Sequence, residues 1–78
     1  MSRHNEKNRQ VFEDSMDGCE AMNEEDFRIA MNKTVVNVEL DNDYSTNQKL
    51  KIYAAMQDLT NCLEKDRRKY VRKVLRLL

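Results

Sequence analysis

The side chains in this sequence that could carry out catalysis are few and far apart. The single histidine, His4, lies in a polar N-terminal stretch that we expect to be a solvated tail. Cys19 and Cys62 are separated by 43 positions and have no histidine or further cysteine at the spacing of a zinc site. Adjacent carboxylates such as Glu24 and Glu25 point apart on a helix. We therefore expect no enzyme active site, no metal, no cofactor and no small-molecule substrate.

A run of basic residues near the C-terminal end carries the clearest functional signal. Positions 65 to 76 hold seven lysines and arginines and one acidic residue. On a helix these cations could neutralise several phosphates of DNA, or they could dock on an acidic protein. The residues that we predict for nucleic-acid or partner docking are Lys65, Arg68, Lys69, Arg72, Lys73 and Arg76.

Two simpler explanations of the same charges stay open. A terminal amphipathic helix needs a solvated face, and cations near the C-terminal end of a helix complement its dipole. The run could also pair with the acidic half of the chain. Residues 1–43 hold five basic and eleven acidic side chains, whereas residues 44–78 hold nine basic and three acidic ones. Such asymmetry is typical of a chain that binds a charged partner or pairs its own halves.

Helical periodicity and capping residues predict three main helices, over about 24–38, 46–61 and 64–78. Asn23 is a suitable N-cap for the first helix, and Ser45 with Gln48 has the spacing of a capping box for the second. Residues 35–40 also fit a short strand by propensity, and a helix that continues unbroken from the second segment to residue 78 is a further alternative. Residues 1–22 form an acidic segment that we expect to be a short helix or partly disordered, so the predicted helical domain is 23–78.

The apolar stripes of the last two predicted helices are large for so short a chain. A sequence of 78 residues that is 40% hydrophobic can build one modest core, and small domains often gain stability from a partner chain. We therefore predict a helical homodimer, with a monomeric three-helix unit as the alternative. The predicted core and dimer residues are Leu50, Tyr53, Met56, Leu59, Tyr70, Val71, Val74, Leu75 and Leu78.

The composition is typical of a small, all-α, cytoplasmic protein. One glycine and no proline are too few turn residues for an all-β fold. The sequence has no apolar run long enough to span a membrane and no secretory signal in its first residues, so we expect no membrane partner.

A set of short segments from residue 23 onward has a layout that is found in a known family of small bacterial proteins. The segments are Asn23-Glu24-Glu25, Val36–Leu40 with Asp41-Asn42, Ser45-Thr46-Asn47-Gln48-Lys49 with Leu50, Met56–Leu59, Tyr70, and Val74 to Leu77. On these positions the sequence resembles the AriR/YmgB-like family of small bacterial biofilm and acid-resistance regulators, which are two-component connector proteins. Its final helix is more basic than is usual in that family, and its first 22 residues have no counterpart there. The sequence also has Asn42 where a turn glycine is common in the family.

This resemblance implies a homodimer of short helices that regulates transcription in biofilm formation and the stress response. It implies action through DNA or through a signalling protein, and it brings no catalytic residue. The sequence thus leads to a small non-enzymatic regulatory protein that acts as a homodimer through its basic C-terminal helix. The alternative is a protein-binding adaptor or inhibitor that uses the acidic N-terminal half and binds no nucleic acid.

Overall fold

The computed structural model describes residues 3–78, with side chains from Glu6 onward. In chain order the elements are α1 (Arg3–Ser15), the short 3-10 helix η1 (Cys19–Ala21), α2 (Glu24–Leu40), α3 (Thr46–Asn61), a second 3-10 helix η2 (Glu64–Asp66) and α4 (Arg67–Leu77). The described residues contain no β-strand. The predicted all-α class is therefore confirmed, although four α-helices are present where we predicted three main ones.

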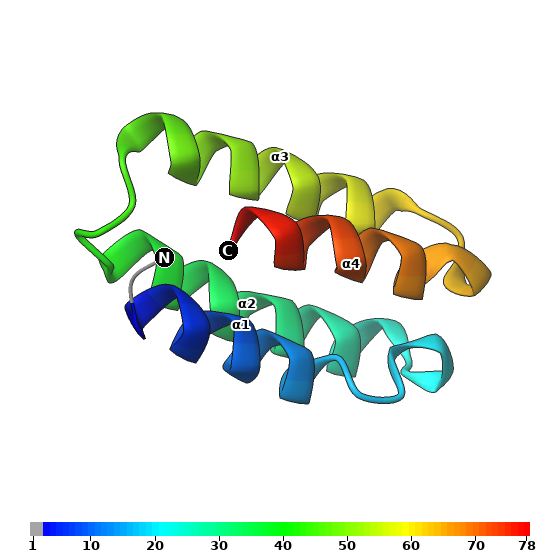
Figure 1. Cartoon of the computed structure of the whole chain (residues 1–78). Coiled ribbons are helices and arrows are strands. Elements are labelled where there is room, and N and C mark those ends of the chain that lie inside the picture. The colour runs from blue at the N-terminus through cyan, green and yellow to red at the C-terminus, as the bar shows by residue number, and fades with distance from the viewer. Residues whose placement is uncertain (1–2) are drawn as a thin grey trace.

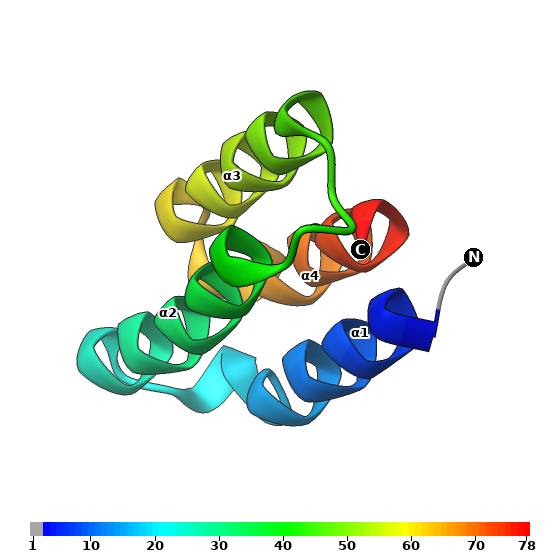
Figure 2. The same cartoon turned by 90° about the vertical axis from the view of Figure 1, so that its left-hand side faces the viewer.

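The four α-helices form an antiparallel bundle with up-down-up-down connections (Figure 1). In the view of Figure 2, α1 and α2 form one antiparallel pair and α3 and α4 the other. Contacts between α2 and α3, and between α1 and α4, join the two pairs. As a result, α2 and α4 lie on one diagonal of the bundle. The molecule measures 32 × 20 × 19 Å along its principal axes.

The N-terminal segment differs most from the sequence-based expectation. We expected residues 1–22 to be a short helix or partly disordered, and the described part forms a helix. This helix is longer and more deeply packed than we predicted. Phe12 lies on α1 and Met16 directly follows that helix, one turn further along, and both side chains are fully buried. After α1 the chain turns at Gly18, whose φ of 72° lies in the left-handed region that favours glycine. The helical domain thus includes this segment as well as residues 23–78.

The two predicted helix starts are confirmed by their capping hydrogen bonds. The Asn23 side chain accepts a bond of 2.8 Å from the backbone N–H of Asp26, at the start of α2. At the start of α3, the Ser45 hydroxyl accepts a bond from the Gln48 N–H, and the Gln48 side chain accepts one from the Ser45 N–H. These bonds satisfy backbone donors that a helix leaves free in its first turn.

Both open alternatives about element boundaries are settled by the structure. Residues 35–40 are helical within α2, because a strand there would have no described strand to pair with. The chain from 46 to 78 is not one continuous helix, since α3 ends at Asn61 and η2 separates it from α4. This break lets α4 fold back along α3, and the pair buries Ile52, Leu59 and Val74 between the helices.

Candidate functional site

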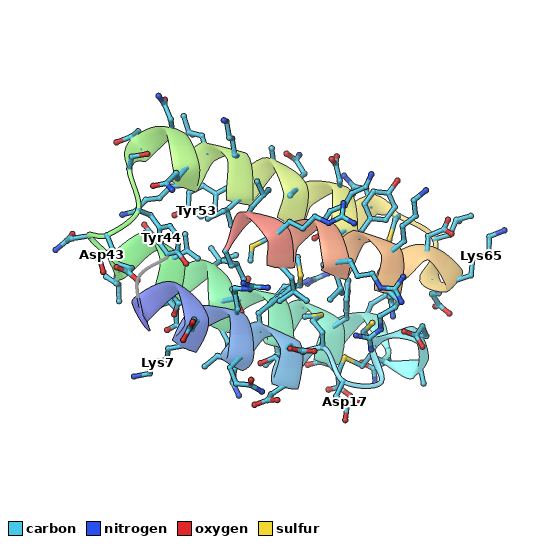
Figure 3. All side chains as sticks on the ribbon, in the orientation of Figure 1. Lys7, Asp17, Asp43, Tyr44, Tyr53 and Lys65 are labelled. Carbon is cyan, nitrogen blue, oxygen red and sulfur yellow. The ribbon has the colours of Figure 1, made fainter. Side chains whose placement is uncertain are left out.

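The predicted docking residues on α4 lie mainly on the outer face of the bundle. Lys65, Lys69, Arg72, Lys73 and Arg76 are all exposed, and we call these five residues the α4 cationic stripe. Lys65 lies on η2, and the other four lie at intervals of about one turn or less on the side of α4 opposite its buried residues. Lys65 extends from the end of the bundle in Figure 3.

The cations of this stripe keep their charges available to a partner. The described residues contain no ion pair that involves any member of the α4 cationic stripe. Two of its lysines lie against an aromatic ring instead, since Lys73 Nζ is 4.8 Å and Lys69 Nζ is 5.9 Å from the centroid of Tyr70. Such contacts stabilise by about 0.5–1 kcal/mol at exposed positions, so they orient the lysines without neutralising them.

Arg68 was predicted to dock a partner, and the structure places it apart from the stripe. Its Nε atom donates to Glu20 Oε1 at 3.1 Å, and its Nη2 atom donates to the main-chain oxygen of Met16 at 3.2 Å. The Arg68 side chain is only 35% exposed. Arg68 thus pairs with the acidic half of its own chain. This is the second of the two simpler explanations of the basic run given in the sequence analysis.

Arg67 has a structural role that the sequence analysis did not identify. Its side chain is 5% exposed, and its Nη1 atom donates to the carbonyl oxygens of Cys19 at 2.9 Å and Met22 at 2.8 Å. Its guanidinium also lies over the ring of Phe27, 4.1 Å from the centroid. The spacing could have revealed that Arg67 is buried. Positions 67, 71, 74 and 78 share one helix face, and the residues at the other three positions are apolar.

An acidic groove lies beside Arg68, along the outside of α1. It has a volume of about 570 Å³ and is lined by Gln10, Glu13, Asp14, Asp17 and Arg68. Asp17 projects from the turn after α1 in Figure 3. The molecule therefore presents a cationic surface on α4 and an acidic one on α1.

The two cysteines are free thiols with little tendency to ionise. Burial raises the pKa of Cys19, and the hydrogen bond from its thiol to Glu20 raises it further. Burial also raises the pKa of Cys62, and the nearby carboxylate of Asp66 adds to that effect. Thiolates are the reactive form, so neither position has the environment of a catalytic cysteine.

The described side chains contain no group of three or more histidine, cysteine or carboxylate residues placed to hold a metal ion. The side chain of His4 lies outside the described residues. In the part of the chain that the structure describes, the helices are too short or too polar to cross a bilayer.

The residues predicted for the core or the dimer interface occupy three kinds of position. Met56, Leu59, Val71, Val74 and Leu78 are buried, whereas Tyr53, Tyr70 and Leu75 are partly buried against the same core. Leu50 is 59% exposed on the outer side of α3. We predicted a dimer because two helices could not cover this set, but α1 and α2 cover most of it within one chain.

No protein-family model, no curated protein and no solved structure matches this chain.

Proposed function

We propose that this chain is a non-enzymatic regulatory protein that docks on the phosphate backbone of a nucleic acid through the α4 cationic stripe. The observation that supports this function is an exposed row of five cations that have no acidic partner among the described residues. A homodimer and a role in biofilm or stress regulation, as the family resemblance implies, belong to the same proposal.

The composition of the α4 face favours phosphates over an acidic protein. Protein interfaces generally have an apolar, desolvated centre that is depleted of lysine. On α4 the apolar residues Val71 and Val74 are fully buried, so the outer face consists mainly of charged side chains, beside the half-buried Tyr70 and Leu77, which is 38% exposed. Contacts with a nucleic-acid backbone, in contrast, are largely electrostatic and release bound counterions.

The length of the stripe also suits a row of phosphates. The rise of an α-helix places Lys69 and Arg76 roughly 10 Å apart along the axis of α4, and Lys65 on η2 extends the stripe beyond them. Each strand of duplex DNA has a phosphate about every 3.4 Å along the axis. The five cations can therefore each meet a phosphate, and binding needs no contact with base edges.

A second candidate function rests on the acidic groove of α1. Glu13, Asp14 and Asp17 line this groove together with Arg68, and they could bind a basic segment of another protein. This is the adaptor or inhibitor alternative, in which the acidic N-terminal half makes the contact and nucleic acid is not bound.

Fluorescence anisotropy with a labelled DNA duplex, titrated over a range of salt concentrations, tests the phosphate proposal. We expect the logarithm of the affinity to fall linearly with the logarithm of the salt concentration, with a slope of about −4 to −5 for five neutralised phosphates. The Arg72→Ala/Arg76→Ala variant should weaken binding and reduce the size of that slope by about 1.8, because each lost contact removes about 0.9.

The control variant is Arg28→Ala/Lys51→Ala, which removes two exposed cations from α2 and α3. It should leave the slope unchanged. Equal losses in the two double variants would show that net charge alone drives binding and would contradict the proposal. A different result would favour the adaptor function over the phosphate proposal. In that case the duplex does not bind, whereas a basic peptide binds the wild type and no longer binds the Glu13→Gln/Asp14→Asn variant.

A further inference from the structure

The outer face of α2 carries a row of apolar side chains that the described residues leave exposed. Ile29, Val36 and Leu40 are 54%, 49% and 76% exposed. Together with Lys33 they follow each other at intervals of four, three and four residues, so they form one line along the helix. We call Ile29, Lys33, Val36 and Leu40 the α2 stripe.

The α2 stripe borders an open groove between α2 and α1. This groove has a volume of about 580 Å³, and its wall on α1 is the side chain of Val11. Asn32 and Asn37 line it together with Ile29, Lys33 and Val36. The surface is thus mainly apolar, with two amides and one cation, which is the composition expected of a helix-binding groove.

We infer that a second copy of this chain covers the α2 stripe, with the two α2 helices packed antiparallel around a two-fold axis. The spacing supports this occupant, because reversing the helix direction maps the stripe onto itself. In the matching register, Ile29 faces Leu40 of the second copy and Val36 faces its Lys33. Every member of the stripe then has a partner, as an interface made of the same patch on both chains requires.

The polar residues also suit self-pairing in this register. Asn32 of one copy lies opposite Asn37 of the other, and each amide can both donate and accept a hydrogen bond. Lys33 can lay its aliphatic stem over the facing Val36 while its ammonium group stays in solvent. The pairing therefore buries apolar surface without burying an uncompensated charge.

The exposed area of the chain gives independent support. The single chain exposes 5472 Å². A folded monomer of 9.3 kDa exposes about 5,000 Å² on average, so this chain exposes about a tenth more. The exposed side chains of the α2 stripe contribute to this area, and a second copy seated there would cover them.

Sedimentation equilibrium of the full chain, without any nucleic acid, tests the inference. Over about 10 μM to about 1 mM, the range that detects weak association, we expect the average mass to rise from 9.3 kDa towards twice that value. Ile29→Glu should raise the dimer dissociation constant by roughly a hundredfold or more, because it places a carboxylate opposite the apolar side chain of Leu40 of the second copy.

Leu63→Glu is the matched control, since Leu63 is 63% exposed on the chain between α3 and η2. It should leave the dissociation constant unchanged, and circular dichroism should show that both variants keep their helix content. A wild-type chain that stays at 9.3 kDa up to about 1 mM would overturn the inference. Equal weakening by both variants, or none by Ile29→Glu, would overturn it too. Because this assay contains no polyanion, its result is independent of the proposed α4 function.

The orientation can be tested separately by disulfide trapping with oxidised glutathione. In a chain that carries Cys19→Ala and Cys62→Ser, the further pair Asn32→Cys/Asn37→Cys should give a covalent dimer rapidly. Asn32→Cys alone should react slowly, because antiparallel packing holds the two copies of position 32 apart. Rapid trapping through Asn32→Cys alone would show parallel helices and would contradict the proposed register.

Discussion

Arg67, Arg68 and Arg72 are close neighbours on α4, yet each meets a different environment. Arg67 lies under the connection between α1 and α2 and donates to two of its carbonyl oxygens. Arg68 pairs with Glu20 at the edge of the same connection. Arg72 is exposed and belongs to the α4 cationic stripe. Position around the helix therefore decides whether a cation stabilises the fold or stays available to a partner.

These environments predict very different costs of substitution. Arg67→Ala should lower the free energy of unfolding by about 3 kcal/mol, because it leaves the buried carbonyl group of Cys19 and the partly buried one of Met22 without their charged donor and removes a ring contact. Urea denaturation followed by circular dichroism measures this change. Arg72→Ala on the same helix should change the free energy by less than about 0.5 kcal/mol. Similar values for the two variants would show that Arg67 is not buried in solution.

The sequence was sufficient to predict the cationic face, but not to tell the cations that pair within the chain from those that stay exposed. The density of lysine and arginine between 65 and 76 marks the region, and six of its seven cations were predicted to dock a partner. The pairing of Arg68 with Glu20 depends on the turn at Gly18, which brings the two residues together across 48 positions of the chain. Patterns of neighbouring residues in the sequence cannot predict a contact between residues that are so far apart along the chain.

At the scale of the elements, α1 shows the limit of periodicity as a predictor. The starts of α2 and α3 were predictable because Asn23 and Ser45 cap their own helices, and such bonds are local. α1 has few apolar residues, and much of its surface is charged or amide-bearing. Short helices of this kind are marginal in isolation. Its stability must come from Phe12 and Met16, whose neighbours in the core belong to helices far along the chain.

Phe12→Ala should lower the free energy of unfolding by about 3–5 kcal/mol. The cause is the loss of a fully buried aromatic side chain and the cavity that it leaves. Chemical denaturation measures the change, with Lys7→Ala, an exposed residue on the same helix, as the comparison. A cost below about 0.5 kcal/mol for Phe12→Ala would place α1 outside the folded core.

At the scale of the whole molecule, a small network of hydrogen bonds closes one end of the bundle. The Tyr44 hydroxyl donates to the main-chain oxygen of Leu78 at 3.3 Å and accepts from Asn8 Nδ2 at 3.4 Å. Asn8 also donates to Asp41 Oδ2 at 3.1 Å. Tyr44 lies between α2 and α3 in the sequence, and in Figure 3 its label marks the end of the bundle near that connection. The network thus ties α1, this connection and the end of α4 together.

This network predicts a dependence of stability on alkaline pH. Burial raises the pKa of Tyr44 above the usual tyrosine value of about 10, and the carboxylates of Asp41 and Asp43 raise it further, while the hydrogen bond from Asn8 lowers it. The folded state thus favours the neutral phenol. The contribution of Tyr44 to the free energy of unfolding is therefore present below about pH 10 and is lost as the pH rises further.

Tyr44→Phe should therefore cost about 1 kcal/mol of unfolding free energy near neutral pH, and its difference from the wild type should narrow above about pH 10. Denaturation of both proteins at several pH values measures this. The raised pKa values of Cys19, Tyr53 and Cys62 affect both proteins alike, so the difference isolates Tyr44. If the difference in unfolding free energy between the two proteins widened with pH, it would contradict a raised pKa of Tyr44.

The diagonal placement of α2 and α4 has a consequence for valency. Because the two helices lie across the bundle from one another, a pair of chains joined along α2 would carry its α4 cationic stripes on opposite outer sides. If the α4 cationic stripe binds nucleic acid as proposed, two stripes on opposite sides of the dimer would not bind neighbouring half-sites of one duplex. They would instead bridge separate duplexes, so that a protein this small could gather nucleic acid into a condensed network.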